Sequence, residues 1–262
     1  MATNDNVGAT AKSDARRDSV LSRRFADAVE FAVRAHGDQV RKGTTIPYVS
    51  HLLGVAALVL EGGGDEDLAI AGLLHDVLED TSATATKVEE AFGPRVAAVV
   101  EGCSDTQEKP KPPALERKQL YLEHLERADA DTLLVSLADK LHNARTLLLD
   151  FRTEGWCVFK RFNLSREETL WYYGELADTF CRLRPGPLAD ELKRVVADLC
   201  REATPIRPSD SNTSRFVSKL SDLTITDKDG DLIWKHGVRY QDGRPFTGTI
   251  DGKKFVNGVP QK

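Results

Sequence analysis

Hydrophobic and polar positions follow helical spacing from residue 21 to about residue 200. In residues 21–36, for example, Phe25, Val29 and Val33 fall on one face of a helix. The same spacing, interrupted by glycine and proline, predicts further helices over residues 49–64, 65–80, 87–103, 115–128, 131–151, 166–183 and 187–200. No alternating strand pattern interrupts this region. The sequence therefore predicts an all-α domain, in which Asp65 or Asp67 caps the helix at 65–80.

The pattern changes after Ala203. Residues 204–214 are rich in Pro, Ser, Asp and Asn, and short β-prone pieces separated by Asp-Gly and Asn-Gly turns follow them. The first 19 residues are polar and small. We expect a disordered leader at 1–19, the all-α domain at 20–203, a linker at 204–214 and a small β-hairpin-rich appendage at 215–262.

Composition narrows the classes of function. The net charge of −5 disfavours long-range attraction to nucleic acid, although an acidic protein can still hold a local basic pocket for a small phosphate ligand. The apolar stretches are too short to span a bilayer, and there is no apolar core of a signal peptide. The four cysteines are widely spaced and form no CxxC pair, so we expect reduced thiols in a cytoplasmic protein.

A cluster of ionisable residues lies within one of the most apolar predicted helices. His75, Asp76, Glu79 and Asp80 form the pattern HDxxED, and helical spacing places them along one side of two successive turns. Ionised carboxylates in an apolar setting are costly unless they are paired or bound to a metal, so a divalent cation would resolve the conflict. For this motif alone, the solvated acidic end of an amphipathic helix is an equally good interpretation.

Two other segments supply matching metal ligands. His51 lies near the start of an apolar helix, and Asp139 lies in the largely apolar run LADKLHNAR. Two imidazoles and two carboxylates suit Mn²⁺, Fe²⁺ or another divalent transition metal, with positions left for water and a phosphate oxygen. Glu79 and Asp80 are placed to orient that water or to move its proton. This combination favours metal-assisted hydrolysis.

Three motifs in this order carry a family resemblance. QVRKGTTIPYVSH at residues 39–51, HDxxED at 75–80 and LADKLHNAR at 137–145 resemble the hydrolase domain of RelA/SpoT enzymes, and most of all the small stand-alone alarmone hydrolases. The resemblance runs from about residue 24 to about residue 199 and implies an HD-type helical fold. It implies four Mn²⁺ ligands, which are His51, His75, Asp76 and Asp139. It also implies two catalytic acids, Glu79 and Asp80, and three residues near the nucleotide, Arg41, Lys42 and Asn143.

The sequence departs from the family pattern at one basic position. Ala114 precedes the run LERK where the animal relative has a lysine, and either Lys109 or Lys111 is a candidate replacement. Lys160 and Arg161 fit two roles equally, contact with phosphate or cover for a helix end.

The expected function is Mn²⁺-dependent removal of the 3′-pyrophosphate from ppGpp or pppGpp, with an enzymatic antitoxin as one setting. Two alternatives stay open: a regulatory module that binds an alarmone or a partner, and a hydrolase of another nucleotide such as ppApp or NADPH. The expected partner is a nucleotide alarmone rather than nucleic acid or membrane. The appendage is the expected surface for a protein partner or for self-association.

Overall fold

The computed structural model describes residues 21–104 and 112–204, and the backbone of short strands between 225 and 260. The expected leader, most of the linker, Lys109 and Lys111 lie outside the described residues. The helices of the described part are α1 (Arg23–His36), α2 (Val49–Glu61), α3 (Glu66–Leu74), α4 (Val77–Asp80), α5 (Ala85–Phe92), α6 (Pro94–Cys103), α7 (Ala114–Leu125), α8 (Ala130–Glu154), α9 (Arg166–Leu183) and α10 (Pro187–Ala203), with a 3₁₀ helix η1 (Gly155–Arg161).

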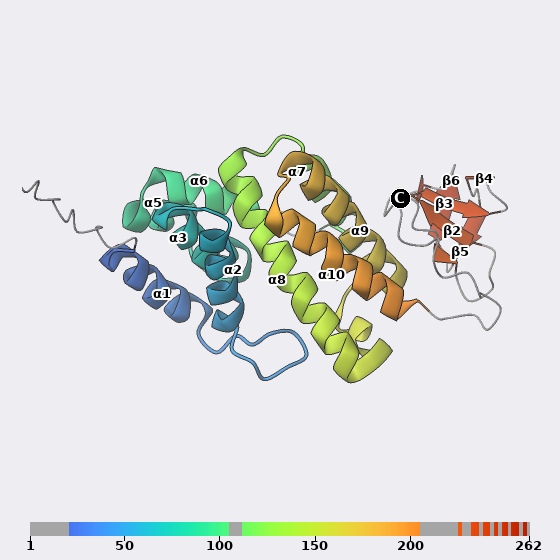
Figure 1. Ribbon diagram of the computed structural model, residues 1–262, viewed down its shortest axis with the longest axis horizontal. Helices are drawn as coiled ribbons and strands as arrows, with labels where there is room; N and C mark the ends of the chain where they lie inside the picture. The colour runs from blue at the N-terminus through green and yellow to red at the C-terminus, as the bar shows by residue number, and fades with distance from the viewer. Residues whose placement is uncertain are drawn as a thin grey trace, which may run out of the picture.

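The long helix α8 is the centre of the helical domain (Figure 1). It packs against α2, α3 and α6 on one side and against α9 and α10 on the other, while α7 packs on α9. Residues 21–104 and 112–204 contain no strand, apart from an isolated bridge between Val40 and Pro47. The prediction of an all-α domain is confirmed.

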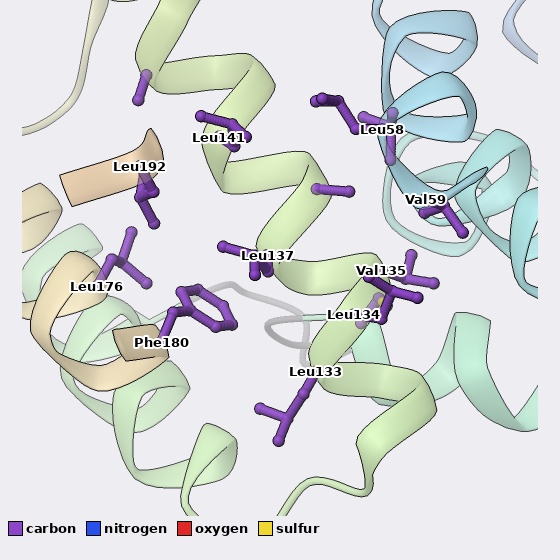
Figure 2. Close-up of a cluster of buried hydrophobic side chains, with 14 of the residues drawn as sticks. Leu58, Val59, Leu133, Leu134, Val135, Leu137, Leu141, Leu176, Phe180 and Leu192 are labelled. Carbon is purple, nitrogen blue, oxygen red and sulfur yellow. The ribbon is translucent and has the colours of Figure 1, made fainter. Parts of the chain in front are cut away.

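The hydrophobic core extends along both sides of α8. Figure 2 shows α8 side chains including Leu137 and Leu141, with Leu58 of α2 on one side and Leu176 and Leu192 on the other. All of these side chains are less than 5% exposed. Residues 132–139 of α8 are all buried, so the polar residue that ends this run lies in the core.

Local sequence explains where several helices begin. Asp65 accepts a hydrogen bond from the Leu68 amide, which confirms the first of the two predicted caps. Ser165 and Glu168 form a capping box at the start of α9. Gly93 has a φ of 93°, a conformation that favours glycine, and Pro94 follows it as the first residue of α6.

Two predicted helices are each divided in the structure. The segment 87–103 is broken by Gly93, which ends α5. The segment 65–80 is broken at His75 and Asp76, where Asp76 has a φ of −98° and a ψ of −3°. The prediction of one continuous helix through HDxxED is therefore wrong, because a turn separates α3 from α4.

Beyond residue 204, the described residues are those of seven short strands. They are β1 (Ile225–Thr226), β2 (Leu232–Lys235), β3 (Val238–Gln241), β4 (Arg244–Pro245), β5 (Gly248–Ile250), β6 (Lys253–Val256) and β7 (Val259–Pro260). They pair antiparallel in the orders β1-β2-β3-β4 and β5-β6-β7. A separately folded β-rich appendage stays a prediction. Among the described residues, no helix is both long enough and apolar enough to cross a membrane.

Candidate metal centre

Four ionisable side chains from three elements converge in the helical core. One ligand atom each from His51, His75 and Asp76 lies within 4.8 Å of the others. Asp139 Oδ1 lies 3.1 Å from His51 Nε2 and 3.5 Å from His75 Nε2. Asp76 Oδ2 lies 3.0 Å from His75 Nε2 and 3.7 Å from His51 Nε2. The structure thus brings together all four residues that the sequence predicted as metal ligands.

The packing of α2, α3 and α8 places these side chains. His51 lies in the first turns of α2, His75 and Asp76 form the turn between α3 and α4, and Asp139 is in the middle of α8. The helices α2, α3 and α8 all contact one another. His51, His75 and Asp139 are each at most 5% exposed. His75 is therefore buried with His51 and Asp139 in the helical core, whereas the alternative interpretation of HDxxED places it on a solvated helix end.

The far side of each imidazole is held by a hydrogen-bond partner. His75 Nδ1 donates to the Gly72 carbonyl at 2.9 Å, so the tautomer leaves Nε2 to face the carboxylates. His51 Nδ1 lies 2.9 Å from His142 Nδ1. Among the described residues, neither His51 Nε2 nor His75 Nε2 has a hydrogen-bond partner of good geometry, although both are buried. Two buried imidazole nitrogens therefore face the carboxylates without a hydrogen-bond partner.

The pKa values of His75, Asp139 and His51 show which of these groups favour a charge. Burial lowers the pKa of His75, but Asp76 and Asp139 outweigh it and raise that pKa well above its usual range. Burial raises the pKa of Asp139, but Lys140 and His75 reverse the effect and hold it well below the usual range. Burial lowers the pKa of His51, with partial compensation from Asp139. The two carboxylates thus stabilise a positive charge at His75, while His51 favours the neutral imidazole.

The donor set fits a divalent cation. Two buried nitrogens without hydrogen-bond partners and two ionised carboxylates are ligands that divalent transition metals accept. The raised pKa of His75 shows that this place between the two carboxylates favours positive charge. A divalent cation in the same place would neutralise both carboxylates and use both nitrogens, so the prediction of a metal site agrees with the geometry.

Two further residues, Tyr48 and His142, support this cluster. The hydroxyl of Tyr48 donates to Asp76 Oδ2 at 2.5 Å. His142 shares a hydrogen bond with His51, and burial, together with His51 and Arg41, lowers the pKa of His142 to about 4, which keeps its ring neutral. Tyr48 was present in the quoted motif, but nothing in the sequence pairs it with Asp76.

The two acids predicted to be catalytic lie on α4, directly after the turn. Asp80 is exposed, and Gln39 Nε2 donates to its Oδ2 at 2.9 Å. His36 Nδ1 lies 2.7 Å from Gln39 Oε1, which orients the Gln39 amide with its N–H toward Asp80. Glu79 is half-buried on the same turn of helix. Both acids are therefore beside the cluster, and Asp80 is held by a side chain from outside α4.

The predicted phosphate-binding loop lies across α8. Arg41 is half-buried, and its Nη2 donates to Asn143 Oδ1 at 2.8 Å, while Asn143 Nδ2 donates to Asp139 Oδ1 at 2.5 Å. Lys42 is exposed to solvent. One chain of hydrogen bonds thus joins the predicted substrate-binding residues Arg41 and Asn143 to the metal cluster.

Arg161 supports this loop instead of facing solvent. Its guanidinium pairs with Asp150 at 2.7 Å and also with Glu154, and its side chain packs against Gly43. A Cβ at Gly43 would lie 2.7 Å from Arg161 Cδ, and the φ of Gly43 is 75°, so the close approach requires glycine. Of the two roles that the sequence left equal for Arg161, cover for the end of α8 is the one that fits these contacts.

Comparison with known proteins places this site in a family. The family model described as an HD domain matches residues 28–162, which is more than half of the chain. The chain belongs to the HD-domain family. All nine predicted site residues of the HD domain fall within the matched span.

Relatives of this HD domain include enzymes named for alarmone hydrolysis. The Xenopus tropicalis guanosine-3′,5′-bis(diphosphate) 3′-pyrophosphohydrolase MESH1 is 41% identical over 133 residues, which are 50% of this chain and 72% of that protein. The Aquifex aeolicus enzyme with the same activity in its name is 41% identical over 152 residues, 57% of this chain and 20% of that protein. The predicted resemblance to RelA/SpoT and stand-alone alarmone hydrolases is confirmed.

A solved structure shares the fold. It is described as a metazoan ortholog of SpoT that hydrolyzes ppGpp and plays a role in starvation responses. The TM-score is 0.58 at 28% identity, and the match covers 71% of this chain and all of that one. The HD-type helical fold is therefore supported both by the matched family and by a neighbouring structure.

Proposed function

We propose that this protein is a metal-dependent pyrophosphohydrolase that removes the 3′-pyrophosphate from ppGpp or pppGpp. The observation that carries the proposal is the buried cluster of His51, His75, Asp76 and Asp139, joined through Asn143 to Arg41 at its edge. The names of the relatives support the choice of substrate. Water would add across the bond between the 3′ oxygen and phosphorus, giving GDP or GTP and pyrophosphate.

Each part of the site has a role in this reaction. The four clustered residues would hold the cation, for which Mn²⁺ is the proposed ion. When bound, such an ion acidifies water and polarises a phosphoryl oxygen. Asp80, oriented by Gln39, and Glu79 beside it would orient the attacking water and take its proton.

The basic loop would bind the substrate phosphates. Arg41 would turn from Asn143 to a pyrophosphate oxygen, and Lys42, exposed on the same loop, would add a second positive charge. Asn143 would then be free to contact the nucleotide while it still donates to Asp139. A substrate with two pyrophosphate groups matches two adjacent cations better than a monophosphate does.

A product assay tests this function. The full chain with Mn²⁺ is incubated with ppGpp, pppGpp, ppApp, GTP and NADPH in parallel, and products are identified by mass and chromatography. We expect pyrophosphate and GDP from ppGpp, and no turnover of ppGpp by the His75→Ala variant. Hydrolysis of ppApp or NADPH alone would keep the reaction type but reject the substrate. Binding of ppGpp without turnover would favour the regulatory module.

We also propose a role for the rest of the chain. The segment 215–262 would form a β-hairpin-rich appendage beyond a linker at 204–214, available for a protein partner, for self-association or for the setting of an enzymatic antitoxin. The four free cysteines, two of them buried, support a cytoplasmic location. Truncation after Ala203 should leave a folded, metal-binding hydrolase, and loss of the helical circular dichroism signal would contradict the division.

A further inference from the structure

The predicted metal ligand Asp139 forms an ion pair with a lysine to which the sequence alone gave no role. Lys140 Nζ lies 2.6 Å from Asp139 Oδ2, with the two side chains only 15% and 8% exposed. We propose that Lys140 is a positioning residue that fixes the Asp139 carboxylate so that Oδ1 alone is offered to the cation. This role rests on the proposed function, because it concerns the same metal centre.

The two oxygens of Asp139 face different groups. Oδ2 is bound to the ammonium of Lys140, while Oδ1 lies 3.1 Å from His51 Nε2 and accepts from Asn143 at 2.5 Å. A carboxylate bound at one oxygen cannot rotate about its Cβ–Cγ bond without breaking a charge-assisted hydrogen bond. The orientation of Oδ1 toward the imidazoles is therefore set by Lys140 as well as by the backbone of α8.

The position of Lys140 is itself set by an aromatic ring. Its ammonium lies 4.6 Å from the centroid of the Tyr121 ring, and Tyr121, on α7, is 2% exposed. The ring attracts the cation without offering a competing carboxylate. Asp139 is the carboxylate to which this buried ammonium is paired. An unpaired ammonium in such a place is costly, so the contact to Oδ2 should persist with or without a cation in the cluster.

Charge explains why a lysine suits this place next to a metal centre. Asp76 and Asp139 together carry two negative charges, which one divalent cation would balance. Lys140 lies on the side of Asp139 away from the imidazoles, so it does not compete for the ligand oxygen. Its added positive charge would leave the occupied centre net cationic, which favours an anionic phosphate as the next ligand.

The test compares Mn²⁺ binding by the full chain and by its Lys140→Met variant, with no nucleotide present. Removal of a group that orients a metal ligand typically weakens binding about 10–100-fold, and we expect a loss in that range by calorimetric titration. The Mn²⁺ paramagnetic resonance spectrum should also change, because Asp139 becomes free to bind through both oxygens. Lys118→Met is the matched control: it removes a cation 5.2 Å from the Tyr172 ring but leaves Asp139 untouched.

The outcomes separate positioning from simple support of the fold. A structural role alone would lower the melting temperature equally with and without Mn²⁺, leave the binding constant within about twofold of wild type, and overturn the proposal. If Lys140→Met does not fold, Lys140→Gln keeps an N–H donor and should show an intermediate loss of Mn²⁺ affinity. Unchanged Mn²⁺ affinity in Lys140→Gln would also overturn the proposal. A chain that binds Mn²⁺ but never hydrolyses ppGpp would reject the proposed function and leave this inference standing.

Discussion

Gly54 offers a direct test of the contact between His51 and His142. It lies on α2, one turn beyond His51, and the imidazole of His142 covers it. A Cβ at Gly54 would lie 2.3 Å from both Cδ2 and Nε2 of His142, whereas ordinary contact begins at 3.4 Å. The Gly54→Ala change must therefore push the ring away by about 1.1 Å, the difference between those two distances.

The magnitude follows from the hydrogen bond that this movement breaks. The Nδ1 atoms of His51 and His142 are 2.9 Å apart, and a shift of that size takes them beyond hydrogen-bond distance. His51 is fully buried, so the loss leaves a buried donor unsatisfied and costs about 1–3 kcal/mol. Alanine in place of a helical glycine adds roughly 0.5–1 kcal/mol to the free energy of unfolding, which offsets part of this cost. Because His51 is a predicted metal ligand, its release should also weaken Mn²⁺ binding about 10–100-fold.

Gly174→Ala is the matched control. Gly174 lies inside α9, and a Cβ there would meet no atom within 4 Å, so this variant gains helix propensity without a clash. Thermal melts should place Gly54→Ala about 1–3 kcal/mol below Gly174→Ala in unfolding free energy, and calorimetry should show the loss of Mn²⁺ affinity for Gly54→Ala alone. Equal stability and equal affinity in the two variants would refute the supporting role assigned to His142.

Three further predictions concern the acids, the basic loop and the metal. Glu79→Gln and Asp80→Asn should retain Mn²⁺, measured by metal analysis, while turnover of ppGpp falls roughly 10²–10⁴-fold, since a general base is lost; full activity in both would reject the mechanism. The double change Arg41→Glu and Lys42→Glu should cost on the order of 1.5–3 kcal/mol in productive binding of ppGpp, seen in kcat/KM, with an unchanged circular dichroism spectrum. Removing Mn²⁺ with a chelator should lower Tm by roughly 5–10 °C relative to protein with Mn²⁺ at 100 times its Kd. The reason is that this excess of Mn²⁺ stabilises the folded state by about 2.7 kcal/mol. An unchanged Tm would contradict the metal site.

The helical fold was predictable because its helices carry their own signals. Apolar periodicity marks the buried faces, and caps such as Asp65 and Ser165 mark the starts. The turn at His75 and Asp76 was missed because the apolar pattern continues across it from Leu74 to Val77, with both of these residues fully buried. Periodicity records which side chains are buried, and here burial continues while the regular helix is interrupted.

The ligands were predictable and their supports were not, for a physical reason. A histidine or an aspartate in an apolar run is conspicuous because burial of a lone charge is unfavourable. The sequence gives no such signal for Tyr48 or Lys140, because tyrosine is commonly half-buried and the lysine ammonium commonly reaches solvent. Their targets depend on how α2, the α3–α4 turn and α8 pack, and the sequence does not specify that packing at the level of single hydrogen bonds.

The origin of the four ligands in separate elements implies that metal binding is thermodynamically coupled to packing of the helical core. Three of the four ligands are oriented by different groups: His75 by a carbonyl of α3, His51 by His142 of α8, and Asp139 by the neighbouring Lys140. The ligand atoms themselves join elements that are distant in sequence. A cation bound there stabilises only the packing that brings α2, the α3–α4 turn and α8 together, since no single element provides all four ligands. Asp76 and Asp139 face each other across the same junction, and the attraction of His75 outweighs the repulsion by Asp139 in setting the low pKa of Asp76. Variants that loosen any one orienting contact should therefore lower metal affinity and stability together, in proportion to how far the ligand atom is displaced.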